Sequence, residues 1–142
     1  MALTPFLLQG LIMGVDEFYC HRRRRLRRWE RVGHPLDTLT FLLSLSWLRM
    51  TTPGPLNVMV FMLLAGFSCL FITKDEWQHK ELCTAFENWL HALLFLIHPL
   101  VLLWAAWLWW TNASMIAVNL AVALAIGFLL YQTIYWRAWR RD

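Results

Sequence analysis

The chain has 142 residues, of which 59% are hydrophobic and only 15% charged, with a formal net charge of +4. Soluble domains average about 45–50% apolar and about 25% charged residues, so this composition excludes a disordered chain, a coiled coil and an ordinary soluble enzyme. The three cysteines form no close pair, which excludes a disulfide scaffold. We expect one domain over residues 1–142, an all-α integral membrane helical bundle.

Five segments approach the roughly 20 apolar residues that a membrane-spanning helix needs. In chain order they are Ala2 to His21, Pro35 to Met50, Leu56 to Thr73, Phe86 to Trp110 and Ala113 to Trp136. Turn-forming residues separate them at 51–55 and 111–112. We expect Pro35 to begin its helix and Pro99 to kink the fourth segment. The second segment is short, and if it is re-entrant the number of spans falls from five to four.

Basic residues predict the orientation of these spans. Twelve of the thirteen lie in the connections 21–34 and 74–85 or in the tail after Trp136, and Arg49 alone lies near the other side. Because Lys and Arg mark the cytoplasmic side, we expect the C-terminus inside and the N-terminus outside a bacterial inner membrane. The arginines flank apolar segments, so orientation explains them better than nucleic-acid binding. The abundant Trp residues, Trp136 among them, are assigned to aromatic belts at the two interfaces.

Acidic and histidine side chains collect on the predicted cytoplasmic side, at spacings that place them on one helix face. The pairs are Glu17 with His21, Glu30 with His34, Glu76 with His79, and Glu87 with His91. His98 follows His91 by seven residues and lies deep in an apolar segment. These nine residues are candidate metal ligands, with Asp37 and Asp75 as candidates to orient them. Asp16, Glu81 and Asp142 break the pattern and are assigned to the solvated interface.

Inward-facing Glu and Glu-x-x-His residues from four helices are typical of dimetal carboxylate bundles. A carboxylate and imidazole set without thiolates favours iron, with manganese and zinc as alternatives, so we predict two metal ions. Cys20 and Cys83 are expected to be reduced thiols rather than ligands. His98 either reaches a metal, which is favoured and implies substrate entry from the lipid, or bonds an acid such as Asp37.

Three stretches carry a resemblance: residues 16–21 (DEFYCH), 29–37 (WERVGHPLD) and 73–79 (TKDEWQH). They look like a family of small bacterial multi-span membrane proteins with no established activity. The ligand types and their placement also resemble membrane diiron proteins such as the alternative oxidases and the fatty-acid desaturases and hydroxylases. The HxxxH and HxxHH boxes of desaturases are absent, and only Glu76 and His79 match the Glu-x-x-His spacing of alternative oxidases. Membrane zinc hydrolases of the ceramidase type similarly collect His and Asp at the cytosolic face.

The favoured function is a dimetal oxidoreductase, with iron as the favoured metal (a diiron centre), that acts with O2 or a peroxide on a lipid-soluble or membrane-proximal substrate. The alternatives are a zinc-dependent membrane hydrolase, a metal carrier or accessory subunit without enzymatic activity, and a b-type haem protein. The expected partners are membrane lipid, that small molecule and an electron donor. A homo-oligomer is compatible with the sequence.

Overall fold

A computed structural model describes residues 1–23, 26–74, 76 and 82–136 of the chain. Within these residues the protein is all-α, which confirms the all-α part of the predicted fold class. Helix α1 (Thr4–Val15) runs directly into a π-helix, η1 (Asp16–His21). It is followed by α2 (Arg28–Met50), α3 (Pro55–Phe71), α5 (Ala85–Thr111) and α6 (Met115–Ile134).

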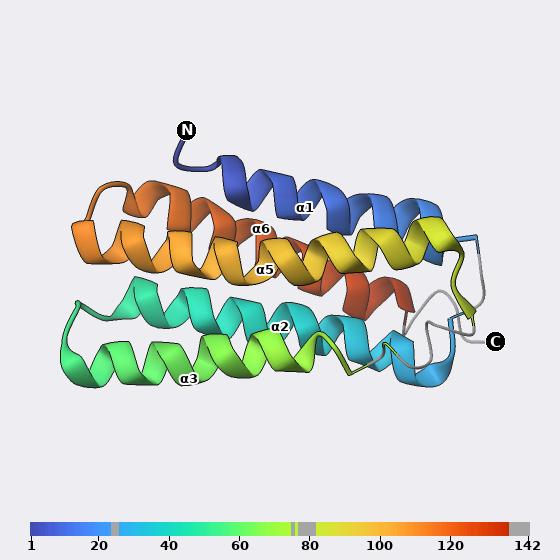
Figure 1. The fold of residues 1–142 in the computed structure, drawn as a ribbon, viewed down its shortest axis with the longest axis horizontal. Coiled ribbons are helices and arrows are strands. Elements are labelled where there is room, and N and C mark those ends of the chain that lie inside the picture. The colour runs from blue at the N-terminus through green and yellow to red at the C-terminus, as the bar shows by residue number, and fades with distance from the viewer. Residues whose placement is uncertain (24–25, 75, 77–81, 137–142) are drawn as a thin grey trace.

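The five α-helices of the described residues form one bundle in which successive helices run in opposite directions (Figure 1). Helix α1 packs against α5, while α2 packs against both α3 and α6. The turns α2–α3 and α5–α6 lie at one end of the bundle, and η1 and the first turns of α2 and α5 lie at the other. The connections between successive helices therefore alternate between the two ends of the bundle, as the sequence predicts. Asn112 ends α5 in the left-handed conformation, with φ 51°, which Asn adopts more readily than most residues.

The second helix differs from the prediction. It begins at Arg28 rather than at Pro35 and has 23 residues, about 34 Å at 1.5 Å per residue. Its first turn is capped because the Arg27 backbone N–H donates to the Glu30 carboxylate at 2.9 Å. Pro35 lies inside the helix, beyond the first turn, so its missing N–H removes one internal helix hydrogen bond. The second segment is therefore one continuous helix, longer than the sequence predicts.

The interior of the bundle is apolar in one half of its length and polar in the other. The half near the α2–α3 turn is filled by a hydrophobic core that includes Leu45, Leu48, Phe61, Val101 and Leu108. The opposite half buries acidic, histidine and amide side chains: Gln9, Asp16, Glu17, His21, Glu30, Glu87, His91, His98 and Gln132. This polar end of the bundle is where the predicted site residues meet.

The outer surface is apolar. Two helices, α5 and α6, are long and apolar enough to cross a membrane, and α3 is a shorter apolar helix. Only 33% and 28% of the apolar windows of α5 and α6 are buried, so most residues in these windows are at least partly exposed, unlike those of a core helix in a soluble protein. Every helix of the bundle also exposes large aliphatic side chains, exemplified by Leu8, Leu43, Leu63, Leu100 and Leu130.

Candidate metal centre

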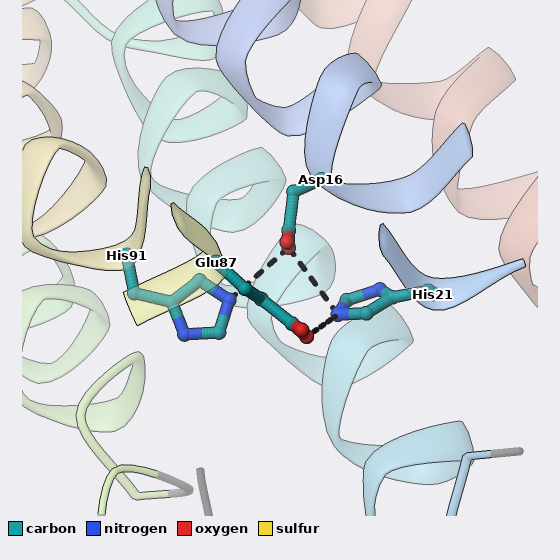
Figure 2. A group of neighbouring side chains, drawn as sticks. All are labelled: Asp16, His21, Glu87 and His91. Carbon is teal, nitrogen blue, oxygen red and sulfur yellow. Dashed lines mark hydrogen bonds and ion pairs between the residues drawn. The ribbon is translucent and has the colours of Figure 1, made fainter. Parts of the chain in front are cut away.

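Four buried side chains from two helical segments converge at the polar end of the bundle: Asp16, His21, Glu87 and His91, the four-ligand cluster (Figure 2). One ligand atom from each lies within 4.8 Å of the others. His21 Nε2 is 3.4 Å from Asp16 Oδ2 and 3.5 Å from Glu87 Oε1. Asp16 Oδ2 is also 3.3 Å from His91 Nε2. Two carboxylates and two imidazoles thus surround one small volume.

The π-helix η1 explains why Asp16 joins the cluster, although the sequence analysis assigned it to the solvated interface. In an α-helix, each residue turns by about 100°, so residues five apart face about 140° away from each other. A π-helix bonds i to i+5, which brings Asp16 and His21 above one another. The assignment of Asp16 was therefore wrong: this side chain is 6% exposed and contacts both histidines of the cluster.

Helix α5 supplies the other half of the cluster from its first turns. Thr84 caps the helix by accepting a hydrogen bond from the Glu87 backbone N–H at 3.2 Å. This places the Glu87 carboxylate in the first turn, where the helix dipole favours a negative charge. His91 lies one turn further along the same face. Since α1 and α5 pack side by side, that face meets Asp16.

Glu17 lies beside the cluster and is held by α6. Its carboxylate is 3.7 Å from His21 Nδ1. It accepts hydrogen bonds from Trp136 Nε1 at 2.6 Å and from Gln132 Nε2 at 3.3 Å. The oxygen of Gln132 in turn accepts from Thr38 at 2.8 Å. Trp136, assigned from sequence to an aromatic belt, is instead 3% exposed and positions an acidic side chain.

The candidates on α2 lie behind His21. The rings of His34 and His21 have centroids 4.5 Å apart. Asp37 Oδ2 lies 4.0 Å from His34 Nδ1 and pairs with Lys74 at 2.6 Å. Glu30 is fully buried and caps the start of α2. The structure thus gives Asp37 a role in holding α2 and the end of α3 together.

His98 lies apart from the four-ligand cluster, seven residues beyond His91. Its Nδ1 is 3.1 Å from Gln9 Nε2 and its Nε2 is 3.0 Å from Ser68 Oγ. Both ring nitrogens therefore have hydrogen-bond partners, which favours the alternative in which His98 bonds a polar side chain rather than a metal. The expected alternative partner, Asp37, is wrong, because amide and hydroxyl groups on α1 and α3 take its place.

The third acid–histidine pair is described only in part. Glu76 is exposed, while His79 and Asp75 lie outside the described residues. Of the cysteines, Cys20 is buried against Ile12 and Leu90 in a small hydrophobic cluster. The donor set at the centre thus consists of oxygen and nitrogen atoms.

A small cavity of about 90 Å³ lies between the cluster and His98, large enough for several water molecules. Asp16, His21 and His91 line it at one end, and Gln9 and His98 line it at the other. Burying several carboxylates together is unfavourable unless cations neutralise them. Carboxylate and imidazole groups are also common ligands of transition metals, so the residues present fit a bound metal ion.

Sequence spacing alone did not identify several of the residues that build this site. Gln9, Gln132 and Ser68 are polar residues in apolar segments, and intramembrane polarity is itself a functional signal. Asp16 gave no such signal, because its position depends on a π-helix. No family model, no curated protein and no solved structure matches the chain, so the assignment of function depends on the site itself.

Proposed function

We propose that the protein is a membrane-embedded metalloprotein whose five helices all cross the bilayer. The apolar outer surfaces of the helices support this, as do the two helices with the length and composition of spans. The basic residues flank the polar end of the bundle, so this end faces the cytoplasm by the positive-inside rule. The metal centre then lies near the cytoplasmic surface of the membrane.

The observation that carries the metal proposal is the four-ligand cluster of Asp16, His21, Glu87 and His91, buried and within 4.8 Å. Mixed carboxylate and imidazole ligation favours iron, with manganese next. We propose two ions. The first is held by the cluster, and the second lies on the other side of His21, where Glu17 and His34 approach.

The chemistry that best fits this centre is oxidation of a lipid-soluble substrate with O2 or a peroxide, since iron held by imidazole and carboxylate groups activates dioxygen. The protein's own residues orient the ligands and limit access. Trp136 and Gln132 fix the Glu17 carboxylate, and such supporting hydrogen bonds set the orientation of metal ligands. A cavity of about 90 Å³ has no room for a porphyrin.

A metal carrier is a poorer fit to the same bundle. Transport would need polar groups that continue from the cluster to the opposite end. Beyond His98, the interior is instead filled by the hydrophobic core around Leu45, Val101 and Leu108. The hydrophobic core therefore separates the metal centre from the end of the bundle away from the basic residues.

Elemental analysis of the purified protein tests the proposal. We expect about two iron ions per chain, and loss of metal in Glu87→Gln and His91→Ala. The control is Leu103→Ala, because Leu103 lies on α5 away from the cluster and is 59% exposed, and this variant should retain metal. A colourless protein that holds zinc would favour a hydrolase, and unchanged metal content in both cluster variants would overturn the metal centre.

A further inference from the structure

A second cavity opens between α1 and α6, beside the metal centre. It has a volume of about 330 Å³, within the range of small-molecule sites. All of its lining residues except Gln9 and Thr38 are apolar. Small residues create the space: Gly10 on α1, where an added Cβ would meet no atom within 4 Å, and Ala121 and Ala125 on α6. We call this space the α1–α6 cleft.

The mouth of the α1–α6 cleft lies on the apolar outer surface. Leu7 and Leu11 on α1 and Leu124 on α6 line it and are 52%, 65% and 56% exposed. If the helices span a membrane, these side chains face acyl chains rather than water. A ligand would therefore enter sideways from the bilayer, and its apolar part would be retained by the cleft.

The inner end of the cleft meets the metal cavity. Both spaces are lined by Gln9, Met13, Thr38, Phe41 and Phe128. The cleft thus abuts the cavity that contains Asp16, His21 and His91. A ligand whose chain fills the cleft would place its polar head in the smaller cavity, beside the cluster.

Gln9 lies where the two cavities meet, and its side chain indicates that the polar head of the ligand carries a hydrogen-bond donor. It is 4% exposed, and its Nε2 is 3.1 Å from His98 Nδ1. Its oxygen, Oε1, is buried and has no hydrogen-bond partner among the described residues. A buried acceptor without a partner is unfavourable, and a hydroxyl group arriving through the cleft would satisfy it. His98 on one side and Met13 on the other fix the amide.

We propose that the α1–α6 cleft binds a single-chain lipid that carries a hydroxyl group, with its chain between the two helices and its hydroxyl donating to Gln9 Oε1. That this lipid is the substrate rests on the proposed function, since the metal centre would act on it. The binding site itself requires no metal. This names the substrate class and gives its route of entry.

Photolabelling of the full chain in lipid nanodiscs tests this. The probe is a dodecanol analogue with a diazirine in its chain and an alkyne for detection, and labelled peptides are mapped by mass spectrometry. We expect saturable labelling of α1 and α6 at the cleft. Dodecanol should compete about tenfold better than its methyl ether, which cannot donate a hydrogen bond. Gln9→Leu should remove that preference.

The matched variants are Leu124→Trp and Leu130→Trp, because both leucines lie on α6 and are 56% exposed but only Leu124 lines the cleft. Leu124→Trp should abolish saturable labelling, and Leu130→Trp should leave it unchanged. Equal labelling of the two variants, or equal competition by dodecanol and its ether, would overturn the inference. Labelling is read from chelated and iron-loaded protein. Specific labelling without iron binding would refute the metal proposal alone, whereas iron binding with unspecific labelling would refute the cleft alone.

Discussion

Replacing Asp16 by Asn is a sharp test of the metal centre, because the change keeps the side chain's size and removes one buried charge. Ligand atoms of the cluster lie within 4.8 Å of one another. At 4.8 Å, the upper limit of that range, two ionised carboxylates repel by about 3.5 kcal/mol at an effective dielectric constant near 20. Without metal at pH 8, where imidazoles are ordinarily neutral, Asp16→Asn should therefore unfold at a higher temperature than the wild type.

Bound metal should stabilise the wild type more than Asp16→Asn. Free iron at about 100 times the dissociation constant stabilises the wild type by about 2.7 kcal/mol. Outer hydrogen bonds to ligands already contribute about 10–100-fold in affinity, so loss of a direct ligand should cost at least about 100-fold. The same iron concentration then stabilises Asp16→Asn by about 0.4 kcal/mol. Addition of metal should therefore raise the free energy of unfolding of the wild type, relative to that of Asp16→Asn, by about 2.3 kcal/mol.

The assay is thermal unfolding in detergent, followed by tryptophan fluorescence, with chelator or with anaerobic ferrous iron. Leu103→Ala is the control, since Leu103 lies on α5 away from the cluster and is 59% exposed, and its loss should leave the response to iron intact. The reasoning is refuted if iron stabilises the wild type and Asp16→Asn equally. It is also refuted if chelated Asp16→Asn is the less stable protein.

Three further predictions concern topology and the surroundings of the cluster. Cysteines introduced at Pro53 and at Asp142 in a cysteine-free chain should react with impermeant reagents from opposite sides of the membrane, with Asp142 cytoplasmic. Trp136→Phe removes the 2.6 Å hydrogen bond to Glu17 and should lower metal affinity about 10–100-fold, measured by chelator competition. His98→Phe should keep the full metal content, but lower the free energy of unfolding by about 1–3 kcal/mol for each buried partner left unpaired.

Each of these has an outcome that contradicts it. Labelling of both cysteines from one side would rule out five spans. The control for Trp136→Phe is Trp110→Phe, because Trp110 is 64% exposed; equal metal affinity in the two variants would remove Trp136 from the site. Loss of a metal equivalent in His98→Phe would restore His98 as a ligand, against its hydrogen bonds to Gln9 and Ser68.

Much of the architecture follows from local sequence. Apolar segments of helical length, separated by turn residues, predict an all-α bundle because the backbone in an apolar medium must satisfy its hydrogen bonds within each helix. The pairs Glu17 with His21 and Glu87 with His91 follow from a four-residue spacing on one helix face. The boundary of α2 did not follow, since its start depends on a cap by Glu30 within a run of arginines that reads as a connection.

The remaining features were decided by tertiary structure. The sequence by itself determined that acids and histidines gather at one end of a helical bundle. Which of them meet depended on the π-helix that turns Asp16 inward and on the packing of α1 against α5, which pairs Asp16 with His91 and Gln9 with His98. Helical spacing reports which residues share a face, but the partner of each face is set by how the helices pack. For that reason the cluster, the tether of Glu17 to α6 and the α1–α6 cleft appear only in the folded chain.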